Sequence, residues 1–134
     1  MNKTKTILIV DDDGDFVESL SVYLESHGFR VIVARDGEEG LKLARMEDPD
    51  LVIMDIVMNE RTEGFFTIRE MRRDSRLQDV PIFVLSSLYS DGGSFRIQPE
   101  AGWLAHDEFM PKPPDVAELI RKIDEHLGTR EASK

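Results

Sequence analysis

Five polar side chains in this 134-residue sequence stand at or just after the ends of short apolar runs: Asp11, Asp12, Asp55, Ser86 and Lys112. Three of them are carboxylates, which repel one another when grouped unless a cation neutralises them. Mg²⁺ suits such a group because it takes hard oxygen ligands and few carboxylates. A carboxylate beside Mg²⁺ can attack phosphorus and become an aspartyl phosphate. The Lys112 ammonium group would balance charge on the oxygens of the transferring phosphoryl group, and the Ser86 hydroxyl group would donate a hydrogen bond to one of them.

Alternating strands and helices must bring these residues together. Apolar runs predict five strands, and helical spacing of apolar residues separates most of them. The expected strands are Ile7–Val10, Val31–Ala34, Leu51–Asp55, Ile82–Leu85 and Phe109–Met110, and the expected helices lie around Phe16–Leu24, Leu41–Met46, Phe65–Met71 and Val116–Leu127. Asp36 with Glu39, and Asp115 with Glu118, resemble capping signals that open the second and the last of these helices. This alternation predicts a doubly wound α/β fold with a parallel sheet, in which all strands end at one edge.

Asp55 is the residue around which this prediction is built. Four apolar residues precede it, which is typical of a strand buried on both faces. A charge in that position is costly unless it is paired or bound to a cation. Taken alone, Asp55 could simply begin a loop. Because Asp11, Asp12 and Ser86 are expected at the same edge, we interpret Asp55 as a phosphoryl acceptor.

Composition excludes several other functions. The formal net charge is −10 and no basic run is present, which argues against direct binding of nucleic acid or of anionic membranes. Without cysteine, the chain has no disulfides, thiolate metal sites or cysteine nucleophiles. No apolar run approaches the roughly 18 residues of a membrane span, and the first residues do not resemble a signal peptide. We therefore expect a cytoplasmic protein that binds a cation or a basic partner.

Residues 88–108 do not follow the repeating pattern. This stretch contains Ser90-Asp91-Gly92-Gly93-Ser94 and has no clear amphipathic stripe. A structureless loop of this length is unusual in a compact domain. We expect a short or broken helix around Glu100–His106 with a mobile segment before it.

Four motifs in order resemble the receiver domain of bacterial two-component response regulators. They are Ile-Leu-Ile-Val-Asp-Asp-Asp, Leu-Val-Ile-Met-Asp-Ile-Val-Met, Ile-Phe-Val-Leu-Ser-Ser and Met-Pro-Lys-Pro. The resemblance runs from Lys5 to about Leu127. It implies a five-stranded parallel sheet in the order 2-1-3-4-5 with helices on both faces, the fourth helix being short or irregular here. Residues 1–128 would form the receiver domain and residues 129–134 a polar tail.

The resemblance also implies roles for individual residues. Asp55 would accept a phosphoryl group from the phosphohistidine of a sensor histidine kinase or phosphotransfer protein. Asp11, Asp12, Asp55 and the backbone carbonyl of Val57 would hold Mg²⁺. Lys112 would pair with the phosphoryl group, and the Lys112–Pro113 bond is a candidate for the cis form.

Conformational switching is the last part of what the resemblance implies. Ser86 would provide the switch hydroxyl, and Phe109 would change rotamer with it. A downstream protein that cannot be named from the sequence would read the change. We expect a monomer or a weak dimer, because the region of the fourth helix departs from the usual family pattern.

Further departures lie beside the site. Asn59 stands where the family usually has proline, Gly64 opens the third helix one residue late, and Ser87 replaces a common alanine. Val57 and Leu88 occupy positions that modulate phosphate hydrolysis in the family. Neither side chain can orient water by hydrogen bonding, so the sequence predicts slow loss of the phosphate.

Other functions fit less well. A receiver-like interaction module that acts without phosphorylation is the main alternative. A phosphatase with an aspartyl nucleophile would usually have a second aspartate at Val57, and a nucleotide carrier would have a glycine-rich loop after the first strand. We therefore expect self-catalysed phosphoryl transfer rather than a turnover enzyme. The chain could be a stand-alone regulator or part of a longer kinase or regulator.

Overall fold

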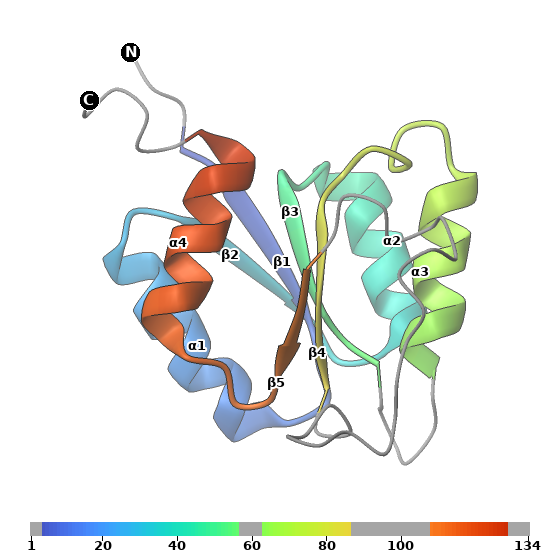
Figure 1. Cartoon of the computed structure of the whole chain (residues 1–134). Helices are drawn as coiled ribbons and strands as arrows, with labels where there is room; N and C mark the ends of the chain where they lie inside the picture. The colour runs from blue at the N-terminus through green and yellow to red at the C-terminus, as the bar shows by residue number, and fades with distance from the viewer. Residues whose placement is uncertain (1–3, 57–62, 87–107, 129–134) are drawn as a thin grey trace.

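The computed structural model describes residues 4–56, 63–86 and 108–128. Five parallel strands form one sheet in the order β2-β1-β3-β4-β5, as the resemblance implies (Figure 1). Helices cover both faces, with α1 and α4 on one and α2 and α3 on the other (Figure 1). In chain order the elements are β1 (Thr6–Val10), α1 (Gly14–Ser26), β2 (Arg30–Ala34), α2 (Gly37–Glu47), β3 (Leu51–Asp55), α3 (Glu63–Arg73), β4 (Ile82–Ser86), β5 (Glu108–Pro111) and α4 (Val116–Leu127).

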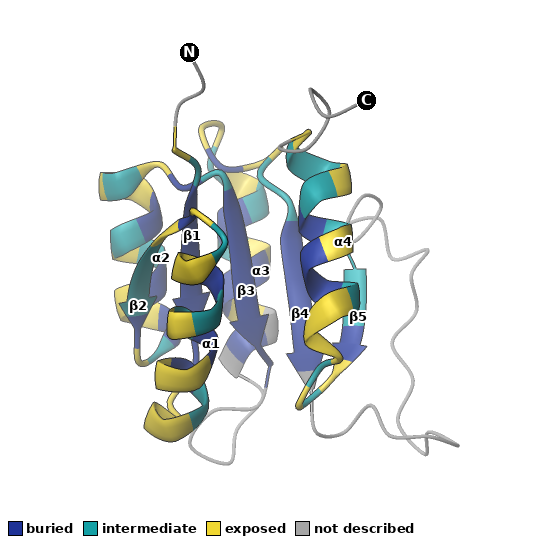
Figure 2. Cartoon of the chain, turned by 90° about the vertical axis from the view of Figure 1, so that its left-hand side faces the viewer, coloured by how far each residue is buried: buried dark blue, intermediate teal, exposed yellow. Residues whose placement is uncertain are grey.

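Alternating side chains of the central strands build two cores. Ile7 and Ile9 of β1 pack in the cluster beneath α1 and α4, whereas Leu8 and Val10 pack in the cluster beneath α2 and α3. Both sets are fully buried, so β1 has no solvent-facing side. This explains why the central strands read as uninterrupted apolar runs. In Figure 2 these strands are dark blue and the outer helix faces are largely exposed.

Aspartate side chains begin three of the helices. Asp13, Asp36 and Asp115 are the N-caps of α1, α2 and α4, and each accepts a hydrogen bond from a backbone N–H of the first turn. A cap of this kind stabilises a helix by about 1 kcal/mol. The capping signals read from the sequence at Asp36 and Asp115 are confirmed. Glu39 differs in one detail, since its carboxylate accepts from the N–H of Arg35, one residue before the cap.

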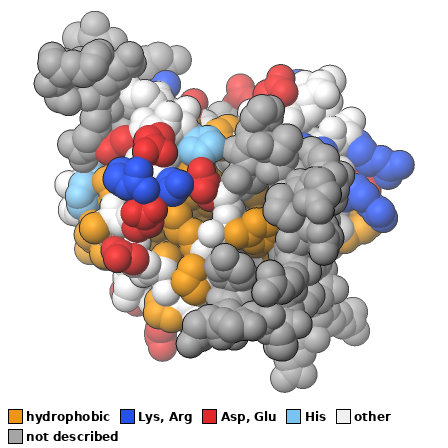
Figure 3. Space-filling view, in the orientation of Figure 1, with side chains coloured by type: hydrophobic (Ala, Val, Ile, Leu, Met, Phe, Trp, Pro, Cys, Tyr) orange, Lys and Arg blue, Asp and Glu red, His pale blue; other side chains and the backbone are white. Residues whose placement is uncertain are grey.

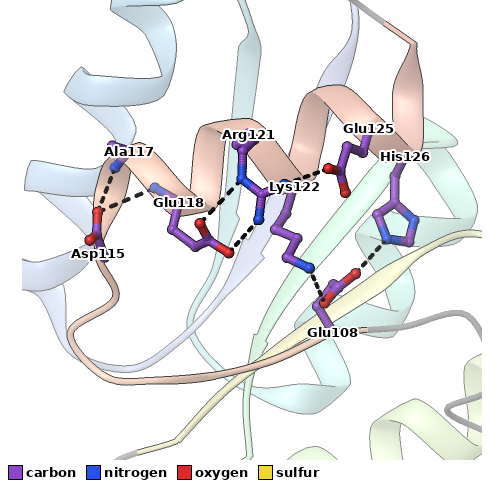
Figure 4. Close-up of polar contacts among 8 residues, drawn as sticks. All are labelled: Glu108, Asp115, Ala117, Glu118, Arg121, Lys122, Glu125 and His126. Atoms are coloured by element: carbon purple, nitrogen blue, oxygen red, sulfur yellow. Dashed lines mark hydrogen bonds and ion pairs between the residues drawn. The ribbon is translucent and has the colours of Figure 1, made fainter.

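The last helix is attached to the last strand through Glu108. The Glu108 carboxylate lies 3.4 Å from Lys122 Nζ and 3.1 Å from His126 Nε2 of α4 (Figure 4). Arg121 forms ion pairs along the same helix with Glu118 and Glu125, and charged side chains gather over α4 in Figure 3. Exposed pairs contribute little individually. The two pairs of Glu108 act locally, because they join α4 to the start of the strand that leads to Lys112.

Some expectations fall on residues that are not described. The short helix around Glu100–His106 and the segment before it lie outside the described residues, as do Val57, Asn59, Ser87 and Leu88. Four helices are present in the described part of the chain. Among the described residues, none of the helices has the length and apolar character needed to cross a membrane.

Candidate functional site

Three aspartates meet at the carboxyl edge of the sheet. Asp11, Asp12 and Asp55 each offer a carboxylate oxygen, and these three atoms lie within 4.8 Å of one another. Asp11 and Asp55 are only 2% and 4% exposed, whereas Asp12 faces solvent. The predicted convergence of these strand ends is therefore present in the structure.

Strand pairing fixes the two buried carboxylates. Asp55 is the last residue of β3 and stands opposite Leu85 of β4. Asp11 follows β1, and its backbone N–H donates to the carbonyl of Ala34 at 3.0 Å, which extends the pairing with β2. The Asp11 carboxylate then accepts the backbone N–H of Asp13 at 2.9 Å. The site therefore begins where the parallel strands end and the first helix starts.

Lys112 links the two buried aspartates. Its Nζ lies 3.0 Å from Asp55 Oδ2 and 3.0 Å from Asp11 Oδ2, and its side chain is 15% exposed. Asp13 Oδ2 lies farther from this ammonium group, at 4.0 Å. Because Lys112 comes directly after β5, a residue distant in sequence reaches the end of the central strands. Charge-assisted bonds of this kind are among the stronger hydrogen bonds in proteins.

Burial and charge shift the pKa values in this cluster. Burial raises the pKa of Asp11 from about 3.8 to about 6, and the nearby Asp55 also raises it, while the Asp13 N–H and Lys112 oppose the rise. Burial alone lowers the pKa of Lys112, but its hydrogen bonds to Asp55 and Asp11 outweigh burial and raise the pKa above its usual value. The charged form of Lys112 is therefore stabilised by its surroundings, whereas burial destabilises the ionised form of Asp11.

The donor set fits a divalent cation. With all four groups ionised, the three clustered carboxylates and Lys112 together carry a net charge of −2. Hard carboxylate oxygens, two of them on buried residues, are ligands that suit Mg²⁺. An ion would also relieve the desolvation and repulsion that raise the pKa of Asp11. The described residues therefore supply both the charge and the ligand type for such an ion.

The comparisons with known proteins agree with this arrangement. A family model for the response regulator receiver domain matches residues 7–124, which is most of the chain. The chain belongs to this family. The match includes all four residues of the cluster, the three aspartates and Lys112.

Several curated proteins are similar to this receiver domain. Protein PilH of Pseudomonas aeruginosa is 40% identical over 122 residues, covering 91% of this chain and 97% of PilH. The master transcriptional regulator RpaA of a Synechocystis strain is 32% identical over 117 residues, covering 87% of this chain and 46% of RpaA. The chain thus spans about half the length of several curated relatives that it matches.

Solved receiver structures share the fold. A putative response regulator from Chloroflexus aurantiacus has a TM-score of 0.77 at 28% identity, covering 94% of this chain and 99% of that one. The receiver domain of a sensor histidine kinase from Pseudomonas aeruginosa has a TM-score of 0.77 at 25% identity, covering 95% and 100%. That structure contains a magnesium ion coordinated in its active-site cleft.

Two further predicted site residues of the receiver, Ser86 and Phe109, lie on neighbouring strands. Ser86 ends β4 opposite Pro111, although its side chain lies outside the described set, as does Val57. Phe109 of β5 is half-buried and packs against the cluster beneath α2 and α3. The Lys112–Pro113 bond is cis, as predicted.

Two features of the receiver site were missed by sequence reasoning. Phe16, interpreted only as part of a helical apolar pattern, places its ring 4.9 Å from Lys112 Nζ. Gly64, interpreted as a helix opening, lies against the backbone of Asp55 and Ile56. Each contact joins two different secondary-structure elements or the loop beside one, so helical spacing could not reveal it.

Proposed function

We propose that Asp55 accepts a phosphoryl group from a phosphohistidine of a sensor histidine kinase or a phosphotransfer protein. The observation that carries this proposal is the position of Lys112, whose ammonium group lies 3.0 Å from the buried Asp55 carboxylate within an acidic cluster. A buried carboxylate can act as the nucleophile, and a fixed cation beside it can balance negative charge on the transferring group. Membership of the receiver family supports the same assignment.

The transfer step balances without any further reactant. An Asp55 carboxylate oxygen forms a bond to phosphorus while the phosphorus–nitrogen bond of the phosphohistidine breaks. The bonding electron pair leaves with the imidazole nitrogen, which takes up a proton from the solvent. Lys112 remains protonated throughout, in keeping with its raised pKa, and pairs with an oxygen of the phosphoryl group.

Asp11, Asp12 and Asp55 would hold Mg²⁺, and the backbone carbonyl of Val57 would be a further ligand. When bound, the ion neutralises charge shared by the acidic residues and the phosphoryl oxygens. The net charge of −2 across the cluster and the magnesium-bound receiver structure from Pseudomonas aeruginosa support this part of the proposal.

The phosphorylated domain would then act through a partner. Ser86 would donate a hydrogen bond to the phosphoryl group, and Phe109 would change rotamer with it, so that two conformations of the β4–β5 region differ in their affinity for a downstream protein. We propose that the chain acts as a monomer or weak dimer in the cytoplasm and does not bind nucleic acid or membranes directly. Where the chain forms part of a longer protein, the activity of that protein is likewise a proposal.

Phosphorylation can be tested with a small phosphoramidate donor and Mg²⁺. Intact-mass spectrometry should show one added phosphoryl group on the wild-type protein, labile to hydroxylamine as an acyl phosphate is. Asp55→Asn should remove the modification, and a chelator should prevent it. Asp15→Asn is the matched control, because Asp15 is an exposed aspartate in the first turn of α1.

The result also separates the alternative function. If the wild-type protein gains no phosphoryl group and Mg²⁺ with a phosphoryl analogue leaves its melting temperature unchanged, the interaction module that acts without phosphorylation is the better account. Modification that persists in Asp55→Asn would place the acceptor elsewhere.

A further inference from the structure

The Lys112 ammonium group contacts an aromatic face as well as two carboxylates. Its Nζ lies over the ring of Phe16, 4.9 Å from the ring centroid, and donates to Asp11 and Asp55 at 3.1 and 3.0 Å. A cation within about 6 Å of a ring centroid is attracted by the negative face of the ring. The Lys112 side chain is 15% exposed, and limited access of water strengthens this attraction.

The first turn of α1 fixes the position of the ring. The backbone N–H of Phe16 donates to Oδ1 of Asp13, the N-cap, at 3.2 Å, and the backbone N–H of Asp13 donates to Asp11 at 2.9 Å. The half-buried ring also packs against the core beneath α1 and α4. A chain of contacts therefore runs from Asp11 through Asp13 and Phe16 to Lys112 and returns to Asp11.

We propose that Phe16 is a positioning residue that holds the Lys112 ammonium group toward Asp55. This inference rests on the proposed function of Asp55 as phosphoryl acceptor. Lysine has a long, flexible side chain that loses considerable rotamer entropy when fixed. Transfer changes what the ammonium group meets at Asp55, because a phosphoryl group is added to that carboxylate. The ring of Phe16 takes no part in the reaction, so its contact with Lys112 can persist before and after transfer.

The ring face, and not apolar bulk alone, is what the inference requires. Leucine fills much of the same space but has no aromatic quadrupole, whereas tyrosine and tryptophan keep an aromatic face. Phe16→Leu therefore removes the attraction, and Phe16→Tyr and Phe16→Trp retain it. Phe29→Leu is the matched control, since Phe29 is a buried phenylalanine just before β2, at the opposite end of the sheet from the site.

The first experiment measures binding of beryllofluoride, a phosphoryl analogue, with Mg²⁺ by titration calorimetry on the full chain. Phe16→Leu is expected to weaken this binding roughly three- to tenfold, the range of a partly desolvated cation–aromatic contact. Tyrosine or tryptophan at this position should restore binding to within about twofold of wild type, and Phe29→Leu should match wild type. Equal affinity of Phe16→Leu and wild type would overturn the inference, as would equal weakening by all three substitutions of Phe16.

A second measurement observes the contact without any ligand. Protons that lie over an aromatic ring are shielded, so the ε-methylene signals of Lys112 in ¹H–¹³C spectra should lie upfield in wild type and in Phe16→Tyr. They should return to ordinary lysine positions in Phe16→Leu. Unshifted signals in the wild-type protein would contradict the inference. If wild type fails to bind beryllofluoride, the proposed function fails, and these signals still decide whether Phe16 holds Lys112.

Discussion

Gly64 at the start of α3 lies directly against the backbone of Asp55. A Cβ added to Gly64 would lie 2.5 Å from the Asp55 carbonyl oxygen and 2.5 Å from Ile56 Cα, and the Gly64 N–H donates to the Ile56 carbonyl at 3.3 Å. These neighbours are backbone atoms, which cannot move aside by changing rotamer. The absence of a side chain at Gly64 therefore lets the third helix approach the proposed phosphoryl acceptor.

Gly64→Ala is expected to destabilise the protein because the added methyl group forces the α3 and β3 backbones apart. Overpacking of this kind typically costs about 1–3 kcal/mol. Urea denaturation measures this loss. The response to Mg²⁺ and beryllofluoride should weaken too, because Asp55 moves with its backbone.

Gly14→Ala serves as the control for this substitution. Gly14 begins α1, and among the described residues no atom outside its chain neighbours and the nearby backbone of the helix lies within 4 Å of a Cβ added there. Alanine has a higher helix propensity than glycine, so stability should stay the same or rise slightly. A Gly64→Ala protein as stable as Gly14→Ala would show that the close approach is unimportant.

The raised pKa of Asp11 predicts a pH-dependent cost to stability in the absence of divalent cations. The folded protein holds the Asp11 proton up to about pH 6, whereas the unfolded chain releases it near 3.8. The free energy of unfolding should therefore fall as pH rises through this window. In buffer with a chelator, Asp11→Asn should melt at a higher temperature than wild type above this window, and the difference should shrink below it. A lower melting temperature for Asp11→Asn at neutral pH would contradict the conclusion that burial destabilises the ionised Asp11 carboxylate.

Asp74→Asn should show the opposite behaviour. A hydrogen bond from the Arg45 side chain, with help from the Arg76 backbone N–H, lowers the pKa of Asp74 below its ordinary value. The stabilisation is present above the unfolded pKa and is lost as pH falls through the folded value. Asp74→Asn should therefore lower the melting temperature at neutral pH.

Asp115 should stabilise the first turn of α4, the helix that follows Lys112. Its carboxylate accepts the backbone N–H groups of Ala117 and Glu118 at 3.0 and 3.2 Å (Figure 4). Asp115→Ala should cost about 1 kcal/mol in urea denaturation because both N–H groups lose their acceptor. Asp115→Ser supplies a replacement cap and should recover most of the loss. If serine and alanine are equally destabilising, the carboxylate acts through another contact.

Slow loss of the phosphoryl group remains a prediction from sequence. Val57 and Leu88 cannot orient an attacking water by hydrogen bonding, so phosphorylated protein should persist well beyond minutes after the donor is removed. Quantitative mass spectrometry over time measures this decay. Changing both residues to polar ones, as in Val57→Asn with Leu88→Gln, should accelerate it. Rapid decay in wild type that the double substitution does not change would refute the prediction.

Local sequence predicted most of the fold. The unbroken apolar run before Asp55 indicated a strand buried on both faces, and β3 has no exposed residue. Capping signals placed the starts of α2 and α4 to within a residue. The expected strands were each correct to within one residue at their ends. These features depend on periodicity and on hydrogen bonds between near neighbours, which a single sequence displays.

The sequence by itself determined which reactive groups are present and that they lie at one edge of the sheet. These groups are three carboxylates, a hydroxyl group and a lysine at the ends of parallel strands. Only the tertiary structure decided how these groups meet. It placed the Lys112 ammonium group between Asp11 and Asp55 and over Phe16, and it seated Gly64 against Asp55. The reason is physical: such contacts depend on how helices and strands pack against one another, and no local period in the sequence encodes that packing.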